Sequence, residues 1–355
     1  MDIVQIIDPM QDPRWDTFVE NHPFGWIVHL SGWKKVLESS FRHIKGHYLV
    51  LIDTASNNIQ AALPIFEVRS RLLGNRLVSI PFATLCDPLI STSGDMTRLF
   101  EEAVRLSKQR NIPSIEIRTL MSISLIQEDS MGVNLFYKHH YLLLDKDPEE
   151  LKRTFNRTNV RKGINKAIRS NLVMKVADSE SDLRIFYELH IKNRKKLGLP
   201  PQPYRFFQML WDTFMQSGKM ILILAQKDDQ TIAGLISFKY KDRFSCEYLA
   251  TDQRFLGIRP NNFLFWEAIK TAYNEGFKVF DFGRTALNNE GLMNFKNRWG
   301  TTMVDFPYLY YPAKLSKKMN NQKTVSGYKL INKICENSPD LVCKLLGQIC
   351  YKHLG

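Results

Sequence analysis

Residues 276–311 read GFKVFDFGRTALNNEGLMNFKNRWGTTMVDFPYLYY, and their pattern decides the fold prediction. The apolar run from Phe277 to Phe282 has a glycine on each side, which is typical of a short buried strand. A short amphipathic turn or helix follows, with apolar side chains on one side at Leu292, Phe295 and Trp299. The alternating, aromatic-rich run from Val304 to Tyr311 predicts a second strand.

Three charged residues lie inside this largely apolar segment. Asp281 and Arg284 stand at the end of the first strand, and Lys296 lies in the turn between the strands. Enzymes commonly place charged groups for a ligand in loops at strand ends. Lys296 and Asp281 are therefore catalytic candidates, and Arg284 is a candidate for substrate binding. The alternative is structural, with a surface lysine and an ion pair between Asp281 and Arg284.

The order DFGR, FK, WG and an aromatic strand resembles the second half of the FemAB-like branch of the GNAT acyltransferase superfamily. Further motifs stand in the order expected for that branch. They are HPFGWIVHLSGW at 22–33, CDPL at 86–89, FNRTNVRKGINKAIRSNLVMKV at 155–176 and YLATDQRFLGIRPNNFLFWEAI at 248–269. The ordered set runs from Phe24 to Tyr311 and is most similar to cell-envelope, polysaccharide-associated variants.

This resemblance implies an α/β fold with mixed sheets (α+β), made of tandem GNAT-like lobes and a C-terminal helical tail. We expect an N-terminal lobe at 1–145, a C-terminal lobe at 146–312 that begins with a basic helix, and a basic amphipathic tail at 313–355. The length of 355 residues also fits two domains of typical size.

The basic helix is the strongest feature of the composition. Seven basic side chains and no acid occur between residues 152 and 169. An Asp-Pro-Glu-Glu start predicts one helix over 147–170. Like charges along a helix repel, so a phosphate-bearing partner is one interpretation and a solvated helix face is the other. The resemblance implies that Arg161 lies near substrate phosphates, and we add Lys162 and Arg157 as substrate-binding candidates.

Further substrate-binding candidates lie in the other motifs. These are Trp33, Tyr248, Asp252 and Asn261. GNAT enzymes hold the pyrophosphate of coenzyme A at a Gly-rich turn before a helix. The matching stretch at 253–260 has one glycine and ends in a proline, which lacks an N–H donor. We therefore expect no tightly bound cofactor. The donor would be aminoacyl-tRNA, as in characterised FemAB-like enzymes, or acyl-CoA.

Composition limits the compartment and the partners. The five cysteines form no CxxC pair and no Cys/His metal spacing, which predicts free thiols in a reducing compartment and no metal site. The start lacks the features of a secretory signal, and no window reaches the roughly 20 apolar residues of a membrane span. His139–His140 is interpreted as a loop or strand edge. The net charge of +13 predicts an anionic partner.

The tail adds a second partner prediction. A helix is expected from Leu341 to His353, with Lys344 and Lys352 on a stripe opposite an apolar face. Such a helix can lie on an anionic membrane or dock on the C-terminal lobe. The expected partners are a phosphate-bearing envelope precursor, tRNA and an anionic membrane surface. The expected location is cytoplasmic, with peripheral contact at the inner face of the membrane as an option.

The favoured function is an N-acyl or aminoacyl transferase that acts on an amine of a peptidoglycan precursor or a related envelope saccharide. The amine would attack the donor carbonyl directly, while Lys296 stabilises the oxyanion or a donor phosphate. Asp281 would orient Arg284 or accept the amine proton. The alternatives are an acyl-CoA-dependent acyltransferase of exopolysaccharide synthesis and a non-catalytic phosphate- or RNA-binding GNAT-like module.

Overall fold

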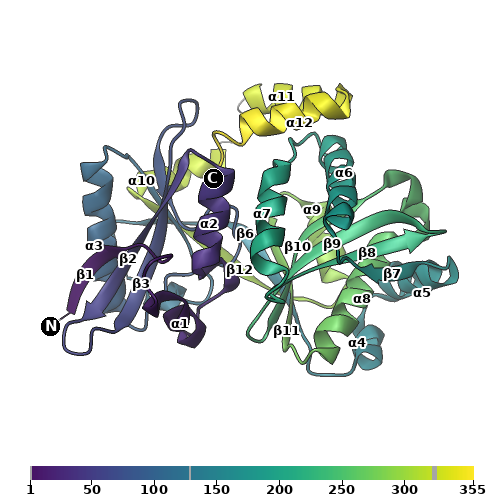
Figure 1. Ribbon diagram of the computed structural model, residues 1–355, viewed down its shortest axis with the longest axis horizontal. Coiled ribbons are helices and arrows are strands. Elements are labelled where there is room, and N and C mark those ends of the chain that lie inside the picture. The colour runs from purple at the N-terminus through teal and green to yellow at the C-terminus, as the bar shows by residue number, and fades with distance from the viewer. Residues whose placement is uncertain (1, 128, 322–325) are drawn as a thin grey trace. The chain divides into compact units, whose positions relative to one another are not determined.

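The computed structural model describes residues 2–127, 129–321 and 326–355, and the chain forms two compact units (Figure 1). Unit 1 and unit 2 alternate along the chain. Unit 1 contains Met1–Tyr137, Asp305–Val325 and Ile349–Gly355, and unit 2 contains Lys138–Val304 and Ser326–Gln348. The chain leaves unit 1 after Tyr137, near the expected lobe boundary at 145/146. It returns to unit 1 at Asp305, inside the aromatic strand, whereas the expected boundary lay after residue 312.

Unit 1 is a sheet with helices on both faces (Figure 1). Its strands are β1 (Asp2–Ile7), β2 (Ile44–Asp53), β3 (Ile59–Val68), β4 (Arg76–Val78), β5 (Ile115–Arg118) and the later part of β12 (Thr302–Tyr311). Its helices are α1 (Arg14–Asn21), α2 (Ser31–Ser40), α3 (Ser93–Gln109) and α10 (Lys314–Asn321), with short turns at Ile27–His29 and Ile123–Leu125. The strands follow the order β1-β2-β3-β4-β5-β12, and only β4 and β5 pair in parallel among them.

Alternating side chains of β2 supply the core on each face of this sheet. Leu49 and Leu51 belong to the cluster that packs against Leu99 of α3. Tyr48, one position away in the strand, meets the ring of Trp15 of α1 edge-on at 5.0 Å. Because successive side chains of a strand point to opposite faces, one strand serves both layers.

Unit 2 is a second mixed sheet between two helical layers (Figure 1). Its strands lie in the order β6 (Gly132–Leu143), β11 (Val279–Ala286), β10 (Arg243–Thr251), β9 (Gln230–Tyr240), β8 (Met220–Lys227) and β7 (Val173–Val176), with the later part of β6 in the unit. Its helices are α4 (Pro148–Thr154), α5 (Lys162–Arg169), α6 (Glu180–Lys196), α7 (Tyr204–Phe214), α8 (Pro260–Asn274), α9 (Glu290–Asn297), α11 (Ser326–Asn337) and most of α12 (Asp340–Cys350). Strands β10 and β11 are parallel, and β7 to β10 are antiparallel.

Aromatic side chains fill both faces of the unit 2 sheet. On one face, Phe282 of β11 stacks on Phe265 of α8 with ring centroids 5.1 Å apart. On the other face, Phe238 of β9 packs against Phe214 of α7 at 6.3 Å. Beneath α8, Gly163 of α5 permits a close helix contact, since a Cβ there would lie 2.9 Å from the Asn262 amide. This contact places the basic segment against the start of α8.

The basic segment is not one continuous helix, and this part of the prediction is wrong. Helix α4 ends before Phe155, whose backbone is extended, and a π-helical turn at Arg157–Arg161 precedes α5. Phe155 is buried against the rings of Trp266 and Trp299. The Asn156 side chain then accepts the Asn159 N–H at 2.9 Å and starts the new turn. Aromatic burial and this cap outweigh the helical spacing of the arginines.

The tail forms helices, and residues 326–348 pack in unit 2. Helix α11 contacts α6, and Nζ of Lys344 on α12 lies 2.9 Å from Oε1 of Glu188 on α6. Gly347 of α12 is buried against the Pro201 carbonyl. Four apolar side chains of the expected tail helix are exposed, at Leu341, Val342, Leu345 and Ile349. In the described part of the chain, no helix has both the length and the apolar content that a membrane crossing requires.

Candidate active site

Asp281 is the centre of a buried cluster of ionisable groups in unit 2. Its side chain is 0% exposed, and its Oδ2 lies 2.9 Å from Nη1 of Arg243 and 3.1 Å from Nε2 of His139. The Gly283 N–H donates to Oδ1 at 2.6 Å. Burial alone would raise the pKa of Asp281, but His139, Arg243 and the amide outweigh burial and hold the pKa well below its usual range. Asp281 is therefore ionised at neutral pH and anchors the cluster.

Lys296 reaches the same cluster from α9. It is 6% exposed, and its Nζ donates to the carbonyls of Gly283 at 2.9 Å and Arg284 at 3.0 Å. Burial lowers the pKa of Lys296 to about 8, against the opposing charges of Asp281 and nearby acidic groups. The amine is thus mostly protonated at neutral pH. An ammonium has three N–H donors, so a third remains for a ligand oxygen after these two carbonyls.

Glu247 is a third member of the cluster, and it is not among the residues predicted from the sequence. It is half-buried on β10, and the Ser245 hydroxyl donates to its Oε1 at 2.5 Å. Burial, assisted by the charge of Asp281, raises the pKa of Glu247 to about 7, although Ser245, Arg284 and Lys296 act in the opposite direction. A carboxyl group that titrates near neutrality is suited to general-base chemistry. The available signal was one glutamate inside the otherwise uncharged strand FSCEYLA.

Three neighbouring strands bring these groups together. Arg243 and Ser245 alternate along β10, and Ser245 pairs in register with Asp281 of β11. Glu247 follows where the register of β10 is irregular, between Cys246 and Tyr248. His139 comes from β6, where His139 and His140 are both 0% exposed. The interpretation of this histidine pair as a loop or strand edge is therefore wrong. Burial and the charge of Lys296 lower the pKa of His140 to about 4, so its imidazole is neutral near pH 7.

Arg284 is the third predicted residue in this cluster, beside Asp281 and Lys296, and the structure gives Asp281 a further partner. Arg284 contributes a backbone carbonyl to Lys296, and its charge lowers the pKa of both Glu247 and Lys296. Arg243, which the sequence did not indicate, forms the ion pair with Asp281. The predicted segment 276–311 therefore contains the anchor, the amine and the arginine, while the proton acceptor comes from elsewhere.

Three other predicted substrate-binding residues pack against or pair with residues of the protein itself. Tyr248 packs edge-on against Phe207 of α7 with centroids 5.1 Å apart. The carboxylate of Asp252 pairs with Arg254 at 2.6 Å and caps the turn at Gln253–Ile258. Trp33 is buried in the core of unit 1. Tyr248 and Asp252 thus have partners within the protein, and the assignment of the three residues to a substrate stays a prediction.

The predicted phosphate-binding residues line one cavity of about 430 Å³ in unit 2. Its lining is Glu149, Lys152, Arg153, Arg157, Arg161, Lys162 and Asn165. Lys152 lies 3.4 Å from Glu149, the one acid in this lining. The Nε of Arg161 is buried and has no hydrogen-bond partner among the described residues. A buried donor of this kind normally has a partner, so the cavity is suited to an anion.

A second cavity, of about 210 Å³, lies at the start of α8. Its lining is Asn159, Val160, Leu256, Arg259, Pro260, Asn261, Asn262, Phe295 and Arg298. Asn159 and Val160 come from the same π-helical turn whose arginines line the first cavity. The first N–H groups of a helix attract anions, and Arg259 and Arg298 add positive charge. Asn261, the last of the predicted substrate-binding residues, lines this second cavity.

The comparisons with known proteins identify the fold. Residues 154–297 match the family model described as an acetyltransferase (GNAT) domain. FemX superposes with a TM-score of 0.70 at 14% identity, covering 89% of this chain and 99% of FemX. The chain has the FemAB-like GNAT fold. L-PGS from Bacillus licheniformis gives 0.58 at 14% identity, covering 92% and 98% of the two chains.

A tandem GNAT protein from the clavulanic acid biosynthesis pathway gives a TM-score of 0.54 at 9% identity, covering 88% of this chain and 98% of that protein. A search of curated proteins finds no match. The expected family resemblance, the mixed α/β fold and the acyltransferase class are confirmed. The matched GNAT domain contains Glu247, Asp281 and Lys296.

Proposed function

We propose that the FemAB-like chain transfers an acyl or aminoacyl group to an amine on a phosphate-bearing envelope precursor, such as a peptidoglycan precursor or a related saccharide. The observation that carries the proposal is the buried cluster of Glu247, Asp281 and Lys296 inside the GNAT domain. Perturbed pKa values with specific charge partners are common at catalytic sites. Cavities lined by cations in the same unit support a phosphate-bearing ligand.

The cluster supports a direct transfer with no covalent enzyme intermediate. The Glu247 carboxylate would take a proton from the acceptor ammonium, and the resulting amine would attack the donor carbonyl. Lys296 would donate its third N–H to the oxyanion that develops there. The new C–N bond forms while the donor C–O or C–S bond breaks, and the leaving oxygen or sulfur takes up a proton. Asp281 would act as a positioning residue, because it holds His139 and Arg243 in place.

The two cavities suggest where the phosphates would bind. Arg157, Arg161 and Lys162 would hold acceptor phosphates in the first cavity. The start of α8, with Arg259 and Arg298, would hold a donor phosphate in the second. The FemAB-like resemblance favours aminoacyl-tRNA as the donor. Acyl-CoA is the alternative donor, since residues 154–297 match the model of an acetyltransferase (GNAT) domain.

A ligand screen by thermal shift tests the proposal. Aminoacyl-tRNA, acyl-CoA, and nucleotide- or lipid-linked precursors would be added singly and in donor–acceptor pairs. A ligand at about 100 times its Kd raises the free energy of unfolding by about 2.7 kcal/mol. Each stabilising pair would then be incubated, and the amide product would be detected by mass spectrometry. Stabilisation without any product would instead support a non-catalytic phosphate-binding module.

A further inference from the structure

The hairpin loop between β3 and β4 of unit 1 carries exposed apolar side chains. Leu72 is 75% exposed and Leu73 is 49% exposed. The loop is held in place, because the Ser70 hydroxyl accepts the Leu73 N–H at 2.9 Å and the Asn75 side chain accepts the Ser70 N–H at 3.1 Å. The two leucines are thus presented by an ordered turn.

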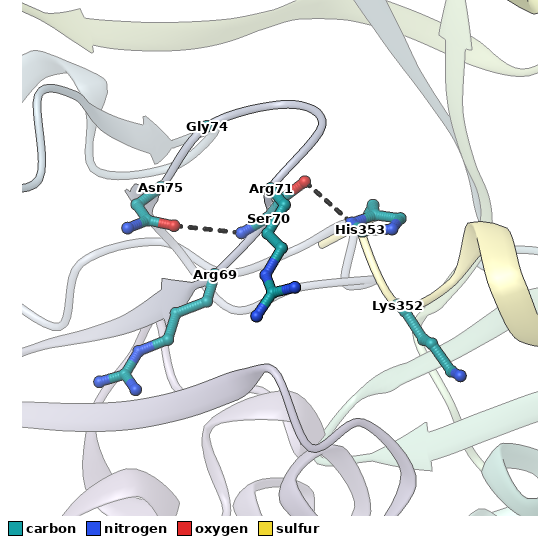
Figure 2. Close-up of a pocket in the computed structure, with 7 residues that line it drawn as sticks. All are labelled: Arg69, Ser70, Arg71, Gly74, Asn75, Lys352 and His353. Carbon is teal, nitrogen blue, oxygen red and sulfur yellow. Dashed lines mark hydrogen bonds between the residues drawn. The ribbon is translucent and has the colours of Figure 1, made fainter.

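Cations surround the base of this turn. A cavity of about 560 Å³ is lined by Arg69, Ser70, Arg71, Gly74, Asn75, Lys352 and His353, with no carboxylate among them (Figure 2). Arg69 pairs with the buried Glu67 through its Nε at 2.6 Å, yet its side chain remains 61% exposed. Figure 2 shows the side chains of Arg69, Arg71 and Lys352 extending toward the same side of the loop, away from Gly74.

The C-terminal segment that supplies Lys352 is fixed beside the loop within unit 1. The Ser70 hydroxyl lies 3.2 Å from Nδ1 of His353 (Figure 2). Nε2 of His43 contacts the Leu354 carbonyl at 2.7 Å. The buried ring of Tyr351 packs 5.6 Å from the ring of Phe82. Two segments far apart in the sequence therefore build one cationic surface next to the leucines. We call it the Leu72 surface, made of Arg69, Arg71, Leu72, Leu73 and Lys352.

We propose that the Leu72 surface docks the protein on an anionic lipid bilayer. Exposed leucines at a loop tip gain free energy when they leave water for the boundary between headgroups and acyl chains. Arginine and lysine side chains next to them reach lipid phosphates, and each cation near an anionic surface strengthens attachment. A nucleic acid would use the cations but would leave the two leucines in water. The mixture of leucines and cations therefore favours lipid.

Vesicle flotation of the full chain tests this docking. The vesicles would contain phosphatidylcholine alone or with phosphatidylglycerol, and binding should require the anionic lipid. Leu72→Glu/Leu73→Glu should reduce bound protein more than about tenfold. Arg71→Gln should reduce it about fivefold and flatten the salt dependence. Because all three side chains are exposed, the melting temperature of each variant should match the parent.

A matched control separates this surface from the tail helix. Leu341 on α12 is 68% exposed, so Leu341→Glu changes an equally accessible leucine in unit 2. Normal flotation of Leu341→Glu together with loss in the double variant supports the Leu72 surface. Loss of flotation in Leu341→Glu, with normal flotation of the Leu72→Glu/Leu73→Glu variant, would overturn the proposal and assign membrane binding to the tail helix. Absent flotation of the parent, or equal flotation on neutral vesicles, would also overturn the proposal. Because the readout needs no substrate, failed docking leaves the proposed transfer chemistry untouched.

Discussion

Two buried aspartates, one in each unit, show how partners decide what a carboxylate does. Asp87 of unit 1 is 1% exposed and Asp281 of unit 2 is 0% exposed. The Oδ1 of Asp87 accepts backbone N–H groups from Leu120, Met121 and Ser122 at 2.7–2.9 Å. It also accepts the hydroxyl groups of that loop, so its partners do not titrate in the physiological range. Asp87 therefore closes a loop.

Asp281 is equally buried, but its interaction partners are of a different kind. Its partners include the ionisable side chains His139 and Arg243, and its charge acts on both Glu247 and Lys296. The result is an amine with a pKa of about 8 and a carboxyl group with a pKa of about 7 in one cluster. Burial alone does not mark an active site. Burial among groups that shift one another's pKa makes a catalytic role a hypothesis worth testing.

The strongest way to test this contrast is to remove the amine. Lys296→Met should lower kcat by about a thousandfold, since it removes a charged donor aimed at the developing oxyanion. The variant should still unfold cooperatively in a chemical denaturation experiment. Near-normal turnover would return Lys296 to a structural role, in which it only holds the carbonyls of Gly283 and Arg284.

Glu247→Gln tests the proton acceptor. General-base catalysis contributes about a hundredfold or more, so we expect kcat to fall by about a hundredfold at neutral pH. Gln keeps the shape and can still accept the Ser245 hydroxyl, which makes it a close steric match. The loss should shrink when the acceptor amine is already deprotonated at high pH. An equal fall in kcat at every pH would contradict the role of Glu247 as a base and would indicate that the substitution disturbs the packing of the site.

Asp87→Asn is the counterpart in unit 1. We expect the free energy of unfolding to fall by about 1–3 kcal/mol, because buried N–H groups of the loop at residues 120–122 lose part of a charged acceptor. The kcat per folded molecule should stay unchanged. Denaturant titration and an active-site-normalised rate measure the two quantities. A large fall in kcat with normal stability would place Asp87 in the reaction and remove the contrast.

Arg161→Ala should have the smallest effect of the four. Binding of the phosphate-bearing substrate should weaken several-fold and lose part of its salt dependence, because one charged hydrogen-bond donor to the phosphate is gone. Lys152→Ala is the matched control, since Lys152 already pairs with Glu149 in the same cavity. Isothermal titration at several salt concentrations compares the two. Equal, small effects would make this cavity wall a solvated helix face.

The local part of the site was predictable from the sequence, and the assembled part was not. Lys296 and Asp281 lie in one segment, and the pattern of apolar and aromatic residues in that segment predicts a strand, a turn and a second strand. Glu247 and His139 reach Asp281 only because β10, β11 and β6 are neighbours in the sheet, and pairing between distant strands leaves no local motif. The break in the basic helix was also not predictable from the sequence, because it depends on the burial of Phe155 against distant side chains.

The pH dependence of transfer by the parent and Glu247→Gln tests the central claim most directly. With a donor–acceptor pair from the ligand screen, kcat/KM of the parent should rise as Glu247 loses its proton through a pKa of about 7. It should fall as Lys296 loses its proton through a pKa of about 8, which gives a narrow optimum between them. Glu247→Gln should lose the inflection near pH 7, so that its kcat/KM follows only the deprotonation of the acceptor amine and of Lys296. A parent profile that is flat from about pH 6 to 9, or an inflection near pH 7 that survives in the variant, would contradict the account.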